Sequence, residues 1–376
     1  MDFYTNVVQW GNFLLVRGVD NNQRVNFRLK YKPTLFVPVM KQTDWKTLDG
    51  KSVTPYQFDC IKDAKDFLLK YESQPHLVHG LNRFAYTYIS DTFPQKVNWN
   101  IDKILIMTID IEVQCENGFP NPESAIEPLL SITVKNQQSK KIIVWGIQPY
   151  KNTREDVTYI RCPNEHDLIM EFMSFWTKNY PDVITGWNTD FFDIPYLANR
   201  IKQVCGEDKM RELSPWKNVS SKQIYSMGRN HLMYDIMGVS QYDYLQLYQK
   251  FTYTRQESYK LDYIASVELG EKKDENPYET FREWYENDFQ SFIDYNIQDV
   301  EIVDKLEDKM GLIDLALTMA YEGKVNYSDV FGQVKYWDIL IYNFLRKRKI
   351  VIPQKSSHSK DEQYEGAYVK EPITGL

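Results

Sequence analysis

Two kinds of apolar pattern follow one another along the chain. In the first hundred residues, apolar positions mostly alternate with polar ones, which is typical of half-buried strands. One stretch instead repeats its apolar positions every three or four residues, as an amphipathic helix does. The alternation predicts strands at Asn6–Val19, Gln23–Leu29, Thr34–Met40 and Tyr86–Ile89, a hairpin turn at Asp20–Asn22, and a helix at Ile61–Tyr71. We therefore expect a β-rich amino-terminal region with some helix.

From Lys103 the pattern changes to strands that alternate with helices. The run KILIMTIDIEV, from Lys103 to Val113, is almost wholly apolar and predicts a central strand buried on both faces. Strands interleaved with helices favour an α/β domain with a mixed sheet. The further strands expected are Leu130–Val134, Lys141–Trp145 and Asp182–Gly186, and the helices are Asn164–Lys178 with Asn164 as N-cap, Phe192–Val204, Asp288–Met310 and a region from Leu312 to Lys349.

Composition narrows the setting in which such a protein works. A chain of 376 residues predicts two domains, and its net charge of −7 provides no general basic field for nucleic acid. Any contact with DNA must then be local or bridged by a metal ion. Four scattered cysteines without a CxxC pair, no signal-peptide pattern and no apolar run of about 18 residues predict a soluble cytoplasmic protein, in the host-cell cytoplasm if the source is viral.

Two acidic residues stand near the end of the predicted central strand. Asp110 and Glu112 are two positions apart, so both side chains point to the same face. Burying two anions together is unfavourable without a cation, and neither Lys nor Arg occurs between Lys103 and Asn117. A divalent ion would compensate them, and carboxylate oxygens favour Mg²⁺ or Mn²⁺ over zinc. A strand end exposed to water is the alternative explanation.

Two later segments add acids at the ends of predicted elements. In GWNTDFFDIPYL, residues 186–197, a strand ends and a helix begins around Asp193. In DYNIQDVEIV, residues 294–303, Tyr295 and Asp299 are four positions apart on one helix face. Together with the first segment, these residues suit phosphodiester hydrolysis by two metal ions roughly 4 Å apart, with a tyrosine placing the water. Taken singly, Asp193 is explained as a helix N-terminal acid, Asn188 as a turn residue, and Tyr295 with Asp299 as a solvated helix pair.

These three segments, in this order, resemble the amino-terminal part of family B replicative DNA polymerases, most closely their bacteriophage branch. IDIEV, GWNTDFFDIPYL and YNIQD match the three exonuclease motifs of that family. The resemblance covers nearly the whole chain and is strongest from Tyr86 onward. Other matching stretches are GFPNPES (118–124), DYLQLYQKF (243–251), SYKLDYIASVELGEKK (258–273), KYWDILIYNFL (335–345) and GAYVKEP (366–372).

The resemblance implies a ribonuclease-H-like 3′→5′ exonuclease domain at residues 103–312. A discontinuous amino-terminal domain would be built from residues 1–102 and 313–376, the latter also leading into the palm. The implied activity releases deoxynucleoside monophosphates from single-stranded 3′ ends and serves proofreading. The implied ligands of two Mg²⁺ or Mn²⁺ ions are Asp110, Glu112, Asp193 and Asp299, with Tyr295 orienting the water.

The resemblance also implies contacts with DNA. Phe119 would wedge against the terminal bases, and Ser221–Tyr234 would form a hairpin that helps part primer from template, turning at residues 227–230. Ordinary loop packing of Phe119 and a solvated turn at the lysines are equally open. The full set of expected DNA contacts is Phe119, Asn188, Phe192, Met227, Arg229, Lys272 and Lys273.

The palm motifs of the family, SLYPS and a later aspartate pair, do not occur in this sequence. We therefore expect no polymerisation by this chain alone. A carboxyl-terminal polymerase polypeptide is the expected partner if the gene is split, and a sliding clamp would be reached only through that part. Two other functions remain open: a catalytically idle scaffold half of the polymerase, and an amino-terminal RNA-binding module using Tyr31, Phe36 and Tyr56.

Overall fold

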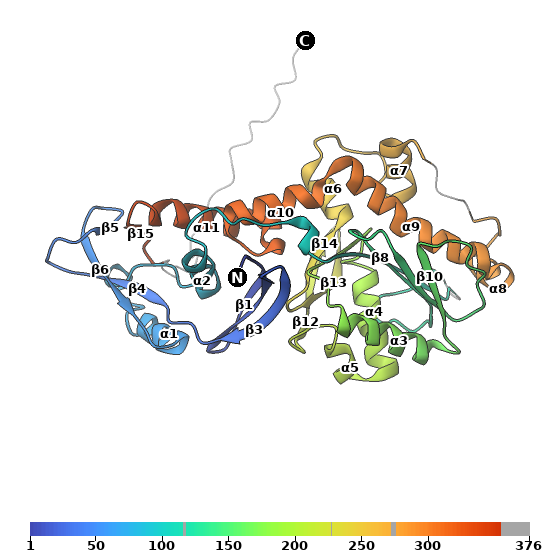
Figure 1. Cartoon of the computed structure of the whole chain (residues 1–376), viewed down its shortest axis with the longest axis horizontal. Helices are drawn as coiled ribbons and strands as arrows, with labels where there is room; N and C mark the ends of the chain where they lie inside the picture. The colour runs from blue at the N-terminus through green and yellow to red at the C-terminus, as the bar shows by residue number, and fades with distance from the viewer. Residues whose placement is uncertain (116–117, 227, 272–275, 355–376) are drawn as a thin grey trace, which may run out of the picture.

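The computed structural model describes residues 1–115, 118–226, 228–271 and 276–354. A β-rich part occupies one end of the molecule and a mixed α/β part the other, with α10 (Leu312–Gly323) between them along one edge (Figure 1). This arrangement agrees with the predicted change of pattern at Lys103. No helix among the described residues combines the length and the apolar character needed to cross a membrane.

The β-rich part contains two antiparallel arrays and two helices. One sheet has the order β1-β2-β3, and a second has the order β15-β5-β6-β4, in which β15 pairs with β5 in parallel. Their bounds are β1 Phe3–Trp10, β2 Phe13–Asp20, β3 Gln23–Leu29, β4 Thr34–Pro38, β5 Trp45–Thr47, β6 Ser52–Gln57 and β15 Ile350–Val351. The helices are α1 Ile61–Lys70 and α2 Phe84–Thr92, with short 3-10 turns η1 Pro75–Leu77 and η2 Ile101–Lys103.

Two expectations for this region are wrong and one is confirmed. The expected strand Asn6–Val19 is two strands, because the chain reverses after Trp10 at Gly11, whose φ is +56°. The expected strand Tyr86–Ile89 lies inside α2, which is buried on most sides, so its short apolar run carries no helical period. The predicted hairpin is present: Asp20 pairs with Gln23 around two asparagines with positive φ.

The α/β part is built on one sheet with the order β10-β9-β8-β7-β11-β14. β7, β8 and β9 pair antiparallel, whereas β10, β11 and β14 join in parallel, so the predicted mixed sheet is confirmed. β7 lies in the interior of the sheet, as expected for the apolar run. The bounds are β7 Ile106–Val113, β8 Leu129–Asn136, β9 Ile142–Gly146, β10 Val157–Arg161, β11 Val183–Gly186 and β14 Ser240–Asp243.

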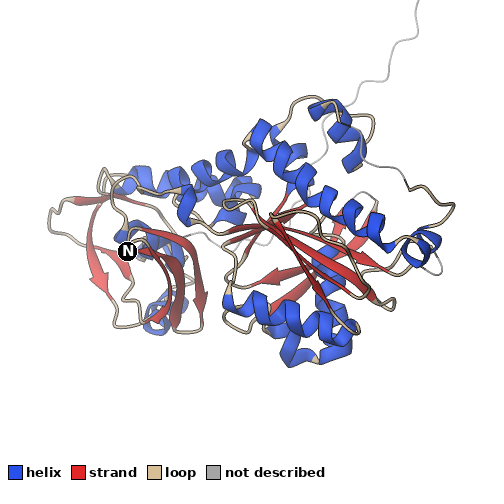
Figure 2. Ribbon diagram, turned by 45° about the vertical axis from the view of Figure 1, so that its right-hand side comes forward, coloured by secondary structure: helices blue, strands red, loops and turns tan. Residues whose placement is uncertain are grey.

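Helices cover both faces of this sheet, as Figure 2 shows. One face packs against α3 Glu165–Lys178 and α4 Asp193–Cys205, and the other against α8 Phe281–Asn287 and α9 Phe289–Met310. Asn164 caps α3 as predicted, accepting a hydrogen bond from the Asp167 N–H at 2.9 Å. The remaining elements are α5 Glu207–Arg211, the antiparallel hairpin β12 Val219–Ser226 and β13 Arg229–Ile236, α6 Tyr244–Phe251 and α7 Leu261–Leu269.

The chain then returns to the β-rich part. The expected helical region from Leu312 is interrupted, because α10 ends at Lys324 with φ +54° before η3 Tyr327–Phe331 and α11 Gln333–Arg346. The Tyr4 hydroxyl donates to the Val325 carbonyl at 2.8 Å. The Asn326 amide both accepts from the Val7 N–H and donates to its carbonyl, each at 2.8 Å. Residues beyond position 312 therefore pack against the first strands of the chain.

Candidate active site

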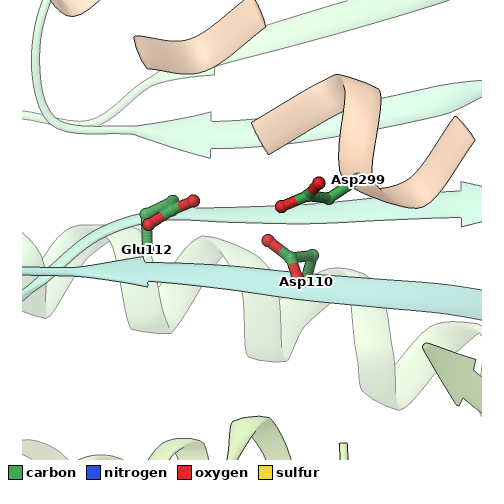
Figure 3. Close-up of side chains that lie close together, drawn as sticks. All are labelled: Asp110, Glu112 and Asp299. Carbon is green, nitrogen blue, oxygen red and sulfur yellow. The ribbon is translucent and has the colours of Figure 1, made fainter. Parts of the chain in front are cut away.

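Three carboxylates from two elements converge above the central strand (Figure 3). Asp110 and Glu112 come from β7, and Asp299 comes from α9. One oxygen of each lies within 4.8 Å of the others. Asp110 and Glu112 are half-buried and Asp299 is buried, so the group lies at the edge of the interior. Three hard oxygen donors at this spacing fit a divalent cation such as Mg²⁺ or Mn²⁺.

The alternation of β7 explains why the acids point to α9. Ile109 and Ile111 belong to the apolar core that contains α3 and α4. Residues between them point to the opposite face of the sheet, where α9 packs. Asp110 and Glu112 are also the two positions of β7 that are not fully buried. The single strand therefore supplies the core with isoleucines and the site with acids.

The neighbouring strand approaches the site closely at Gly186. Its φ is +158°, and a Cβ at this position would lie 2.5 Å from the backbone oxygen of Ile109. Only glycine leaves room for β11 to lie this near the residue that precedes Asp110. The turn that follows, which leads to Asp193, is placed relative to β7 by this contact.

Asp193 occupies a different position from the other three acids. It is the first residue of α4, and its Oδ1 accepts a hydrogen bond from the Ile111 N–H at 3.1 Å. The carboxylate is 3% exposed, and burial raises its pKa to about 8, with the charge of Asp299 adding to the shift. The structure therefore brings three of the four expected ligands together and ties the fourth to the strand between the first two.

Comparison with known proteins agrees with this geometry. The family model described as "DNA polymerase family B, exonuclease domain" matches residues 82–264. The DNA-directed DNA polymerase of Escherichia phage RB69 is 35% identical over 99% of this chain and 44% of its own length. The chain belongs to DNA polymerase family B. The polymerase of Enterobacteria phage T4 is 33% identical over the same shares, and the DNA polymerase delta catalytic subunit of Candida albicans is 27% identical over 75% of this chain and 28% of its own length.

The exonuclease domain of this family B chain has the ribonuclease-H-like fold that the motifs implied. The chain spans 44% of the length of the two phage polymerases. The three-acid group lies on one strand inside the matched range and one helix beyond it, so α9 completes a site that β7 begins.

Asn296 is a residue of the site that the motifs did not single out. It is fully buried, and its Nδ2 donates to Asp110 Oδ2 at 2.5 Å. Its Oδ1 accepts from the hydroxyls of Ser131, at 3.0 Å, and Thr133. Asn296 thus fixes one oxygen of Asp110 and leaves the other for a ligand. Its spacing of three from Asp299 on the same helix was the available signal.

Asp243 is a second residue that the motifs did not assign. It precedes α6 and accepts hydrogen bonds from the N–H groups of Asn188, at 3.0 Å, Asp190, at 3.2 Å, and Leu245, at 2.9 Å. Asn188 has φ +64°, so it shapes the turn after β11. Burial raises the pKa of Asp243 to about 6. Asp243 therefore holds the turn that leads into Asp193, and the N-cap position before an apolar helix was its signal.

The aromatic residues near the site are divided between surface and interior. Phe119 is 84% exposed, and its ring centre lies 5.0 Å from that of Phe192. Tyr295 packs edge-on against Trp284, with ring centres 4.9 Å apart, and so lies among the aromatic side chains of α8 and α9. The ring of Phe191 lies 4.4 Å from that of His231 on the β12–β13 hairpin.

Several expected DNA contacts lie outside the described residues. These are Met227, Lys272 and Lys273, together with the matching stretch at residues 366–372. The backbone of Arg229 is described as the first residue of β13, opposite Ser226. The predicted hairpin is present as β12 and β13, which pair from Val219 with Ile236 to that tip.

Proposed function

We propose that this chain is the proofreading part of a replicative DNA polymerase and hydrolyses DNA from single-stranded 3′ ends. The observation that carries the proposal is the meeting of Asp110, Glu112 and Asp299 within 4.8 Å in a chain with the family B exonuclease domain. The products would be deoxynucleoside monophosphates. The alternative of an idle scaffold is disfavoured because its acids would have no reason to converge.

The proposed metal site takes two Mg²⁺ or Mn²⁺ ions. Bound there, they would lower the pKa of a water molecule and stabilise charge on the attacking and leaving oxygens. Asp110, Glu112 and Asp299 would hold them, with Asp193 as a fourth ligand reached by exchanging its bond to the Ile111 N–H. Asn296 keeps the Asp110 carboxylate in place and ionised. Tyr295 would orient the attacking water.

The proposed DNA contacts begin with the exposed pair Phe119 and Phe192. Two tilted rings on the surface offer a stacking platform for unpaired bases. Because the net charge is −7, we place the attraction for the phosphates in the metal ions and in local contacts. The further contacts proposed are Asn188, Met227, Arg229, Lys272 and Lys273.

The proposed division of the chain assigns residues 103–312 to the exonuclease domain and the flanking segments to the amino-terminal domain. The hydrogen bonds of Tyr4 and Val7 to residues after α10 support it. A carboxyl-terminal polymerase polypeptide is the proposed partner, and a sliding clamp would be reached through it. We place this work in the cytoplasm of the host cell, in keeping with the phage relatives.

The RNA-binding alternative finds less support. Tyr31 is buried, and its hydroxyl donates to Asp91, so its ring face is not available to a base. Tyr56 is exposed, but it stacks on Phe67 at 5.9 Å between ring centres. These aromatic side chains therefore form no common platform.

The test of the proposed function is digestion of single-stranded DNA with Mg²⁺. A 5′-labelled strand should shorten as a ladder, and a 3′-labelled strand should release a mononucleotide at once. Asp110→Ala should reduce the rate at least about a hundredfold because it removes a metal ligand. Asp314→Ala, an exposed acid on α10, is the matched control. Undiminished digestion by Asp110→Ala, or internal cleavage, would refute the assignment.

A further inference from the structure

Helix α11 carries an apolar stripe on its outer side. Val334, Trp337, Ile341 and Phe344 are 71%, 56%, 50% and 55% exposed. They are three or four positions apart, so they lie along one side of the helix. We call these four residues the α11 stripe. The helix lies at the edge of the molecule (Figure 1).

The opposite side of α11 anchors it to the amino-terminal domain. Ile339 is the one buried residue of this helix, all of which the structure describes. Lys335 pairs with Asp329 at 2.9 Å, Asp338 with Arg83 at 3.5 Å, and Arg346 with Asp91. The helix is thus held in place by ion pairs around its sides. The stripe is left outward by a fixed geometry and not by a loosely packed end.

The chemistry of the stripe fits a protein partner better than nucleic acid. Large contiguous apolar side chains on a surface mark protein interfaces, and tryptophan is enriched among the residues that dominate their affinity. The neighbouring cations Lys335 and Arg346 are paired with acids of the same chain. Arg348 lies over the ring of Phe344 at 3.6 Å, which extends the flat surface and does not offer a free charge.

We propose that the α11 stripe is the docking surface for the polymerase part of this same polymerase, the polypeptide that makes up the remaining length of the relatives. The inference rests on the proposed function, because it takes this chain as one part of a larger enzyme. The phage relatives extend over more than twice the length that the chain covers. A long apolar surface is what one part of a larger enzyme would bury against the rest.

The position of α11 in the chain supports this occupant. After α11 only β15 follows among the described elements, and it pairs with β5 at the edge of its sheet. The stripe therefore lies next to the place where the chain leaves the amino-terminal domain. Four side chains are too few for a stable interface, which needs roughly 1,000 Å² or more in total. They would form its apolar centre.

The experiment mixes the whole chain with the polymerase part produced as a separate polypeptide and measures their dissociation constant. Trp337→Ala and Ile341→Glu should each weaken binding roughly tenfold or more. Leu69→Ala, an equally exposed apolar residue on α1, should leave binding unchanged. Melting curves check that the variants fold, and because their side chains are exposed we expect no loss of stability.

Two further readouts decide what covers the stripe. Digestion of single-stranded DNA by the chain alone should be unchanged in Trp337→Ala, so a failed nuclease assay and a failed docking assay remain separate results. Sedimentation should show a monomer. The proposal would be overturned by the absence of a complex, by a complex that tolerates both stripe variants, or by self-association that Trp337→Ala abolishes.

Discussion

The Asp110 carboxylate shows how single residues build this site. Its direction comes from the alternation of β7, and its orientation comes from the Asn296 amide, which is itself held by Ser131 and Thr133. A ligand fixed in this way loses little freedom when it binds an ion. Asn296 acts through Asp110 and is therefore a positioning residue.

Asn296→Ala should lower nuclease activity roughly tenfold to a hundredfold and raise the Mg²⁺ concentration needed for half-maximal rate. The physical reason is that Asp110 would no longer be held in its binding orientation. A titration of rate against Mg²⁺ measures both effects, and partial rescue at high Mg²⁺ separates positioning from simple misfolding. Asn287→Ala, an exposed asparagine on α8, is the control. An unchanged Mg²⁺ dependence would contradict the assigned role.

Asp190 is a buried acid beside the site that the proposed chemistry does not use. Burial and the charge of Asp243 raise its pKa to about 8, and its Oδ1 lies buried without a hydrogen-bond partner. The folded protein therefore holds this proton more tightly than the unfolded chain, whose carboxyl has a pKa of about 4. Stability is highest below that value and falls as the pH rises towards 8.

Asp190→Asn should stabilise the protein more at pH 8 than at pH 5, by a difference on the order of 1 kcal/mol, because the amide needs no proton. Denaturant unfolding at the two pH values measures this difference. Asp208→Asn, at an exposed position on α5, should show no such pH dependence. Equal effects at both pH values would mean that Asp190 is ionised in the folded protein.

At the scale of elements, the β12–β13 hairpin differs from the rest of the α/β part because it belongs to no larger sheet. Its strands pair over their full length, and Tyr225 near the tip is 74% exposed. The stacking of Phe191 on His231 connects the hairpin to the turn that precedes α4. A change at the tip can therefore alter DNA handling while the carboxylates stay in place.

Replacing residues 225–230 by Asn-Gly would shorten the hairpin and keep the Ile224–His231 pair. We expect the wild type to digest matched duplex ends more slowly than single strands, since melting the end takes a few kcal/mol. The shortened hairpin should slow duplex digestion roughly fivefold further, because the melted end is no longer kept apart. Single-strand digestion is the internal control. An equal fall on both substrates would argue against strand separation.

At the scale of the whole molecule, a buried ion pair joins the two parts of the chain. Arg17 of β2 lies 3.2 Å from Asp182, next to β11, and donates to the carbonyls of Tyr180, at 2.9 Å, Pro181, at 2.7 Å, and Gly238. Arg24 and Thr5 also bond Asp182, at 3.0 and 2.9 Å. Such a network, once formed, tolerates the loss of a member poorly.

Arg17→Met should lower the free energy of unfolding by on the order of 3 kcal/mol, because it leaves buried carbonyls and part of the Asp182 charge uncompensated. Calorimetry should show a lower melting temperature and separate transitions for the two parts. Arg28→Met, on the exposed side of β3, should change little. A single unshifted transition in Arg17→Met would show that the junction does not depend on this pair.

The sequence by itself determined the parts of the protein that depend on local order. The apolar run of β7, the Asn164 cap, the two-asparagine hairpin and the facing of Asp110 with Glu112 follow from periods of two and 3.6 residues and from capping chemistry, which act over a few positions. The same order of motifs indicated the family, which the comparisons confirmed.

Only the tertiary structure decided what distant segments do together. α2 is a helix because it is buried on most sides, and such an environment leaves no period in the sequence. Asp193 sits apart from Asp110, Glu112 and Asp299 because its helix begins on the Ile111 backbone. The roles of Asn296 and the α11 stripe likewise depend on which side of a helix meets another element. Packing between residues far apart in sequence fixes these contacts, and no local pattern encodes them.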